Sequence, residues 1–232
     1  VSITANTYGR NSNDVLHEVQ QRLTGLEMPA GYSINYSGEQ EEQEKASAFL
    51  EKAFVGAIFL IMLVLVTQFN SLLQTLIVMT SVLLSLTGVF LGLMITGMPF
   101  GIIMTGIGVI SLAGVVVNNA IVLIDYINQL VKDGMEARSA LVRAGVVRFR
   151  PVMLTAATTI LGLLPMAVGI SYNFRNLSWD IGGESADWWG PMAVAVIFGL
   201  AFATLLTLIV VPVLYSLADS LRNLSWRKSQ QQ

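Results

Sequence analysis

The chain has 232 residues, of which 54% are hydrophobic and only 12% are charged, and its mean hydropathy is +0.66. Because roughly a quarter of the residues in a typical soluble domain are charged, this composition predicts an integral membrane protein. The net charge of -2 provides no field that would attract nucleic acid, and the absence of cysteine excludes disulfides, thiolate metal sites and cysteine nucleophiles.

The first 52 residues are polar and hold eight of the fifteen acidic residues. Residues 1–7 alternate like a strand, residues 14–23 space their apolar side chains like an amphipathic helix, and residues 32–36 again suit a strand. A strand-helix-strand unit over residues 1–38 is too short to bury its own core, so we predict that it completes a larger soluble domain. Because the chain begins without an initiator Met or a targeting segment, we expect it to be a segment of a longer protein.

Residues 39–52 contain no helix breaker and lead directly into apolar sequence, which predicts one helix that begins in water and enters a membrane. A hydrocarbon core about 30 Å thick requires about 20 apolar residues in a helix. The predicted fold is therefore an all-α polytopic membrane bundle of five transmembrane helices within residues 53–217, preceded by a short α+β piece. The predicted spans are residues 53–69, 73–96, 102–127, 152–171 and 190–217.

Lys and Arg gather in two segments beside the predicted spans, a loop of residues 129–151 and a tail of residues 218–232. Segments of this kind face the cytoplasm. We therefore predict a cytoplasmic loop, a cytoplasmic C-terminus, and an N-terminal part on the outer side of the membrane. The basic residues are Lys132, Arg138, Arg143, Arg148, Arg150, Arg222, Arg227 and Lys228.

The third predicted span contains three polar side chains, Asn118, Asn119 and Asp125. Polar groups at membrane depth are costly and commonly functional. Asn118 and Asp125 are two helical turns apart, so they project from nearly the same face, about 10 Å apart along the axis, and could line one polar path. The two Asn could equally be hydrogen-bonding contacts between packed helices, and Asp125 could be a solvated carboxylate at the span end.

The fourth predicted span opens with Arg148, Arg150 and Pro151, and Pro151 suits the first turn of a helix. Arg148 could reach inward to a carboxylate, or both Arg could only anchor the helix at the membrane surface. Thr155 could join the polar path, or it could donate a hydrogen bond to a backbone carbonyl one turn earlier in its own helix.

No enzyme signature is present in the sequence. The single histidine, His17, lies in the polar N-terminal part, so no imidazole is available at membrane depth as a base or a metal ligand. No phosphate-binding Gly-Lys motif occurs either. The sequence thus predicts ion coupling or a supporting membrane role, without a cofactor or a metal, rather than an enzyme.

Four ordered blocks of sequence resemble the C-terminal repeat of resistance-nodulation-division efflux pumps, in the acriflavine-resistance branch typified by AcrB-like multidrug pumps. The blocks are Gly114 to Tyr126 (GVVVNNAIVLIDY), Arg148 to Thr155 (RFRPVMLT), Trp188 to Gly199 (WWGPMAVAVIFG) and Val210 to Tyr215 (VVPVLY). The resemblance covers the whole chain. It implies that the N-terminal piece closes a periplasmic porter subdomain and that the five spans are the last ones of a longer inner-membrane protein.

The resemblance also implies a homotrimer that is driven by a proton gradient and passes substrate to a periplasmic adaptor and an outer-membrane channel. In the multidrug members, a proton relay pairs two Asp of an earlier span with a Lys, assisted by an Arg and a Thr. Arg148 and Thr155 match the Arg and the Thr, whereas Asn118 occupies the place of the Lys. The two Asp belong to the half of the family's proteins that precedes this sequence.

We therefore predict a segment of a proton-coupled pump that exports small amphiphilic or hydrophobic compounds across the inner membrane. Its predicted coupling residues are Asn118, Asn119, Asp125, Arg148 and Thr155. The alternative is an accessory or structural membrane module without transport of its own, in which the polar side chains only pack.

Overall fold

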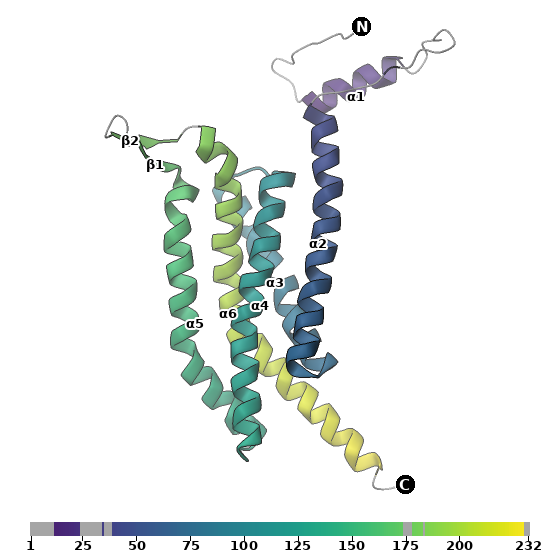
Figure 1. The fold of residues 1–232 in the computed structure, drawn as a ribbon, viewed down its shortest axis with the longest axis vertical. Helices are drawn as coiled ribbons and strands as arrows, with labels where there is room; N and C mark the ends of the chain where they lie inside the picture. The colour runs from purple at the N-terminus through teal and green to yellow at the C-terminus, as the bar shows by residue number, and fades with distance from the viewer. Residues whose placement is uncertain (1–11, 24–33, 35–38, 174–177, 183, 230–232) are drawn as a thin grey trace. The chain divides into compact units, whose positions relative to one another are not determined.

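The computed structural model describes residues 12–23, 34, 39–173, 178–182 and 184–229, and it forms six helices and one hairpin within them (Figure 1). The chain divides into two compact units at residues 48 and 49, a boundary that falls inside the second helix. The elements are α1 Ser12–Leu23, α2 Glu39–Phe69, α3 Leu72–Thr96, α4 Ile102–Lys132, α5 Ala137–Val168, β1 Ile170–Asn173, β2 Ser178–Ile181 and α6 Glu184–Ser229.

Five described helices, α2 to α6, are long and apolar enough to cross a membrane, which confirms the helical-bundle prediction. The predicted helix that leads from residue 39 into the first span is the single helix α2. In the N-terminal unit, the predicted amphipathic helix is α1. The predicted strands at residues 1–7 and 32–36 lie outside the described residues, apart from Ile34.

The joints between the first three spans have local chemical causes. Asn70 adopts the left-handed conformation, with φ at 47°, after α2 ends, and Asn tolerates that region better than most side chains. The Ser71 hydroxyl then accepts a hydrogen bond from the Gln74 backbone N–H at 3.4 Å and caps α3. At the other end of α3, Gly97 takes the left-handed C-cap conformation, with φ at 67°.

The predicted loop of residues 129–151 is mostly helical, because α4 continues to Lys132 and α5 already begins at Ala137. Pro151 is therefore inside α5, and its prediction as a first-turn residue was wrong. Ala140, Leu141 and Ala144 are buried, so the start of α5 has an apolar face that packs although its average hydropathy is low. Pro151 removes one backbone hydrogen bond from α5, and the helix is bent along its length (Figure 1).

A hairpin lies in the joint between the last two predicted spans and was not predicted. Strands β1 and β2 pair antiparallel, directly after α5 ends. Helix α6 then runs through 46 residues, so it exceeds the predicted span of residues 190–217 at both ends and includes most of the predicted tail.

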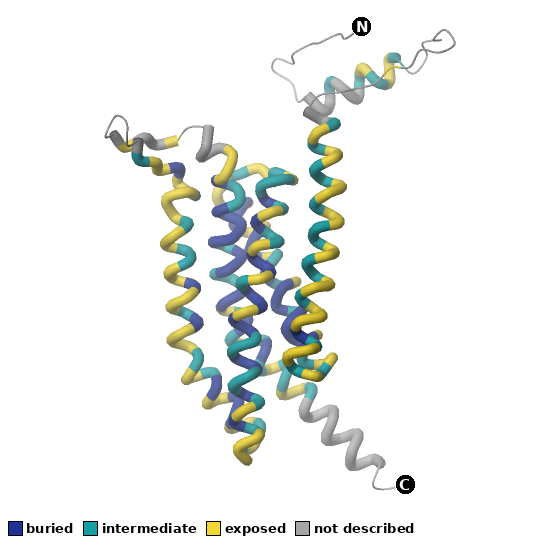
Figure 2. The backbone as a smooth tube through the Cα atoms, in the orientation of Figure 1, coloured by how far each residue is buried: buried dark blue, intermediate teal, exposed yellow. Residues whose placement is uncertain are grey.

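Glycine allows three helices to approach one another closely in the centre of the larger unit. A Cβ atom built on Gly88 of α3 would lie 2.5 Å from the Phe202 Cβ and 2.7 Å from the Phe198 backbone oxygen of α6. On α6 itself, a Cβ at Gly199 would overlap Leu112 of α4 and lie 2.9 Å from Val89 of α3. The buried residues accordingly lie mainly along α3, α4 and α6 (Figure 2).

Helices α2 and α5 are peripheral. In the most apolar 18-residue stretch of each helix, 6% of α2 and 11% of α5 is buried. The corresponding shares are 56% for α3, 50% for α4 and 50% for α6. Most of the surface of α2 and α5 is therefore exposed (Figure 2), and much of it is apolar, as suits contact with lipid or with further protein.

We expect Gly88→Ala to destabilise the helix bundle, because the new methyl group meets a backbone carbonyl that cannot rotate away. Overpacking of this kind costs about 1–3 kcal/mol. The control is Gly162→Ala on exposed α5, where nothing lies within 4 Å and removing a helical glycine should stabilise by up to about 1 kcal/mol. Thermal unfolding midpoints of the purified protein in detergent measure both, and an equal response of the two variants would contradict the close approach.

Candidate functional site

The predicted site residue Arg148, on α5, contacts Tyr126 of α4. The Arg148 guanidinium carbon lies 4.6 Å from the centroid of the Tyr126 ring, over its face. Such a cation–π contact is worth about 0.5–2 kcal/mol, with the larger value in a desolvated site. The Arg148 Nε atom is buried and has no hydrogen-bond partner in the described part of the chain. The charge of Arg148 is thus only partly compensated by these five helices.

Asp125 is the neighbour of Tyr126 in sequence and is half-buried. Its Oδ2 atom accepts a hydrogen bond from the Gln129 Nε2 at 2.8 Å, one turn later in the same helix. This carboxylate therefore has a local polar partner on α4.

The two adjacent Asn of α4 have different surroundings. Asn118 is exposed, whereas Asn119 is only 7% exposed. Successive residues of a helix point about 100° apart, which accounts for the difference. Asn119 suits a packing role inside the bundle, while Asn118 lies on a surface that a further element can reach.

Thr155 is also exposed, and its hydroxyl donates to the Val152 carbonyl at 2.9 Å, so the local hydrogen bond considered above is present. Thr155 follows Arg148 by two turns on α5, and Asn118 precedes Asp125 by two turns on α4. Because the short turn after α4 makes the two helices antiparallel, both steps run toward the same end of the bundle. Asn118 and Thr155 thus lie at similar depth, about 10 Å from the Arg148 level.

A second polar cluster, which we name the amide cluster, joins three helices and was not predicted. Gln74 of α3 and Asn128 of α4 exchange two side-chain hydrogen bonds of 3.0 Å each. The Tyr215 hydroxyl of α6 donates to the Asn128 Oδ1 atom at 3.0 Å. Two amides near the ends of apolar spans were a usable sequence signal, but only the packing shows that they pair.

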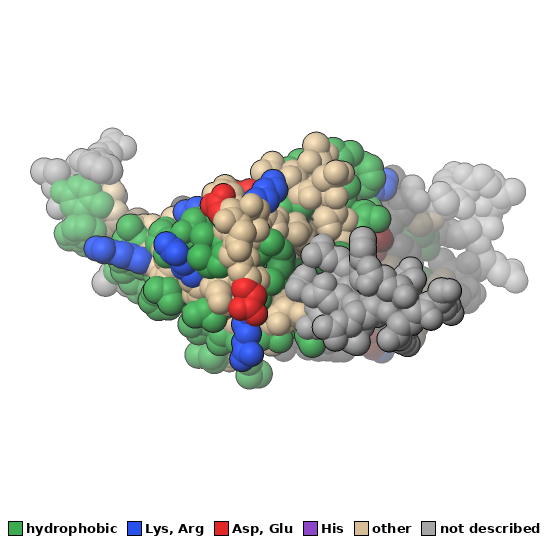
Figure 3. Space-filling model, turned by 90° about the horizontal axis from the view of Figure 1, so that it is seen from below, with side chains coloured by type: hydrophobic (Ala, Val, Ile, Leu, Met, Phe, Trp, Pro, Cys, Tyr) green, Lys and Arg blue, Asp and Glu red, His purple; other side chains and the backbone are tan. Residues whose placement is uncertain are grey.

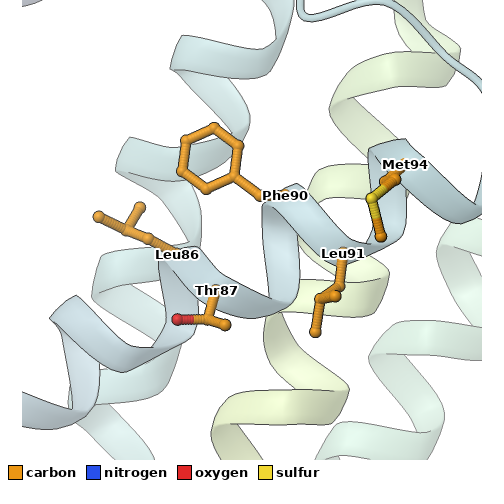
Figure 4. Close-up of a pocket in the computed structure, with 5 residues that line it drawn as sticks. All are labelled: Leu86, Thr87, Phe90, Leu91 and Met94. Carbon is orange, nitrogen blue, oxygen red and sulfur yellow. The ribbon is translucent and has the colours of Figure 1, made fainter.

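Two further surfaces belong to the description of the bundle. An apolar hollow is lined by α3 alone, with Leu86, Thr87, Phe90, Leu91 and Met94 around it (Figure 4). Basic side chains gather on the end of the bundle that holds the α4–α5 turn (Figure 3), where Lys132, Arg138, Arg143 and Arg150 are exposed. No group of three or more His, Cys, Asp or Glu that could hold a metal ion occurs among the described residues.

Five apolar helices with ionisable side chains at their contacts define a polytopic membrane protein. Residues 1–219 match the AcrB/AcrD/AcrF family, and the chain belongs to this family of resistance-nodulation-division efflux transporters. Members of the family are secondary active transporters and not enzymes.

The relatives include pumps with different named functions. The chain is 33% identical over 219 residues to the cobalt-zinc-cadmium resistance protein CzcA of Cupriavidus metallidurans. The matched region covers 94% of the chain and 19% of CzcA. It is 30% identical over 205 residues to the multidrug resistance protein MdtC of Erwinia tasmaniensis, which covers 88% of the chain and 19% of MdtC.

A crystal structure of a heavy metal efflux pump superposes on the chain with a TM-score of 0.72 at 30% identity, covering 93% of the chain and 20% of the pump. The chain therefore spans about a fifth of the length of the relatives that it matches.

We expect Gln74→Leu and Asn128→Leu each to destabilise the bundle by about 1–3 kcal/mol, because each leaves the other amide without its partner. The double variant should lose less than the sum, with a coupling energy of about 0.6–1.7 kcal/mol for hydrogen bonds between membrane helices. Denaturant unfolding in mixed micelles measures the free energy of unfolding of the original protein, the two single variants and the double variant.

The matched control is Thr158→Val, which removes an exposed hydroxyl that bonds only carbonyls of its own helix. Its effect should be small. Strict additivity of the two Leu substitutions would show that Gln74 and Asn128 do not interact.

Proposed function

We propose that the chain works as part of a proton-coupled efflux pump in which Arg148 is the central coupling residue. The observation that carries this proposal is the partly buried guanidinium of Arg148, whose Nε lacks a hydrogen-bond partner among the described residues while Tyr126 covers the cation. A cation at membrane depth is costly unless it is paired. A carboxylate from a part of the pump outside these described helices is the partner that such a site requires.

Coupling follows from the different acid-base chemistry of the two groups. Arginine stays protonated at all physiological pH values, so Arg148 offers a fixed charge. A carboxylate that pairs with it loses this attraction when a proton neutralises it, and regains the attraction when the proton leaves. Proton transfer at the carboxylate therefore favours one helix arrangement over another. The two Asp that the family resemblance implies would supply this carboxylate.

The remaining predicted residues have supporting roles in this proposal. Asn118 and Thr155 are exposed at similar depth and offer hydrogen bonds without a change of charge. Asp125, whose Oδ2 atom accepts a hydrogen bond from Gln129, precedes Tyr126 in sequence and adds a polar side chain near the depth of the Arg148–Tyr126 contact. Asn119 is buried and serves mainly to join α4 to its neighbours within the bundle.

The family and the apolar helices support an inner-membrane, multi-pass protein. We further propose the orientation that the basic end of the bundle favours, with the α4–α5 turn and the C-terminus in the cytoplasm and residues 1–52 in the periplasm.

The pump would be a homotrimer that works with a periplasmic adaptor and an outer-membrane channel. Its proposed cargo is amphiphilic or hydrophobic compounds, and divalent metal cations are the second candidate because of the similarity to CzcA.

We expect Arg148→Ala, introduced into the complete pump, to abolish proton flux and resistance to exported compounds. The variant pump should still be produced at the normal level in an efflux-deficient bacterium. Asn118→Ala should reduce both proton flux and resistance. The control is Arg150→Ala, which removes the same charge from an exposed position two residues later. Proton flux is measured with a pH-sensitive dye in vesicles. Full activity of Arg148→Ala would favour the accessory-module alternative, and equal loss in both Arg variants would assign Arg148 to anchoring.

The cargo class is decided in the same vesicles. If the cargo is amphiphilic, a lipophilic dye added under a proton gradient should be transported and should dissipate the gradient. Zn²⁺ at equal concentration should neither be transported nor dissipate it. The reverse result would assign metal cations as the cargo. Arg148→Ala vesicles provide the background for both measurements.

A further inference from the structure

The β1–β2 hairpin separates apolar from polar residue pairs. Ile170 pairs with Ile181 and Tyr172 pairs with Trp179, whereas the alternate pairs are Ser171 with Asp180 and Asn173 with Ser178. Directly opposed residues of an antiparallel pair share a face, and successive pairs alternate between faces. The register therefore puts Ile170, Tyr172 and Trp179 on one face of the hairpin and Ser171 on the other.

The apolar face has little cover from the described part of the chain. Trp179 is 71% exposed and Ile170 is 40% exposed, although the Tyr172 and Trp179 rings meet edge to face with centroids 5.0 Å apart. An isolated two-stranded hairpin is at best marginally stable in water. The hairpin therefore requires an apolar surface against which its aromatic pair can lie.

The place of the hairpin in the fold indicates which surface that is. Strand β1 begins two residues after α5 ends, and the Gly182 N–H donates to the Gly169 carbonyl at 2.9 Å, which closes the base of the hairpin beside the helix end. Leu154, Leu161 and Val168 recur at intervals of two turns on α5 and are all exposed. The exposed apolar stripe of a membrane-crossing helix thus leads directly into the hairpin.

The start of the next helix carries a similar signal. Trp188 and Trp189, in the first turns of α6, are exposed by 55% and 44%. Trp and Tyr concentrate at the boundary between hydrocarbon and water, because an apolar ring and a polar N–H or O–H suit its two sides. Three exposed Trp, at 179, 188 and 189, therefore lie in the segment that joins the apolar stretches of α5 and α6.

We propose that the β1–β2 hairpin is a membrane-interface anchor that binds the lipid surface through Ile170, Tyr172 and Trp179. Ile170, Tyr172 and Trp179 lie at the boundary between the lipid head groups and the acyl chains, and Ser171 lies toward water. The anchor fixes the depth and rotation of the ends of α5 and α6. It requires α5 to cross the membrane and is independent of proton coupling through Arg148.

The test places a spin label at one position on each face of the hairpin. The complete protein is reconstituted in phosphatidylcholine–phosphatidylglycerol nanodiscs. This chain has no cysteine, so Trp179→Cys and Ser171→Cys add single attachment sites to it, and cysteines elsewhere in the complete protein are first replaced. We expect a label at 179 to be reached by oxygen in preference to a water-soluble nickel chelate, and a label at 171 to show the reverse. Preference for the chelate at both positions would place the hairpin in water. Protection of 179 from both reagents would mean that protein covers it. Either result overturns the proposal.

A second measurement keeps the native side chain at the position of interest. Phosphatidylcholine brominated near the head group should quench the tryptophan fluorescence of the unmodified protein more than that of Trp179→Phe, and the difference should shrink when bromine is placed near the chain end. An unchanged quenched fraction in Trp179→Phe would contradict lipid contact at Trp179. Proton flux through both proteins should be the same, so a defect in pumping does not decide this result.

Discussion

The close approach of α6 to α3 and α4 determines the rest of the structure. Inside a bilayer, lipid tails are as apolar as leucine, so helices associate through tight van der Waals packing rather than through the hydrophobic effect. Gly88 and Gly199 let helix surfaces meet where any larger side chain would collide with backbone or core atoms. This contact leaves α2 and α5 at the periphery, and for that reason Arg148 and Thr155 lie near the surface of the bundle instead of in its centre.

The amide cluster and Arg148 differ in how far their hydrogen bonds are satisfied, and this difference supports the proposal that the first has a packing role and the second a coupling role. In the amide cluster, Gln74 and Asn128 satisfy each other, and Tyr215 adds a third bond. A satisfied network of this kind holds one arrangement of α3, α4 and α6. Arg148 instead has a buried, unpartnered Nε and a ring beneath its charge. An incompletely paired cation costs more than a satisfied amide pair gains, so it has reason to persist only where a further partner completes it.

The sequence was sufficient to predict five long apolar helices, because hydropathy over about 20 residues is a local property. It failed where the outcome depends on contacts. The segment from Ala137 to Arg150 resembles a charged loop by average hydropathy, yet Ala140 and Ala144 find a packing surface and the helix forms. The strands have four residues each, which is too short for alternation to be distinguished from the polar joint around them.

The same limit applies to the candidate site. Residue type and depth predicted Arg148, Asn118 and Thr155, but the ring beneath Arg148 and the different environments of Asn118 and Asn119 follow from helix rotation and packing. These contacts bear on the proposed mechanism. With an amide at 118, no charge can change at that position, and with arginine at 148 the cation is permanent. In the proposed pump, the group that gains and loses the proton must therefore be a carboxylate. The part of the bundle described here supplies the fixed positive charge of Arg148, which attracts that carboxylate when it is ionised and not when it is protonated.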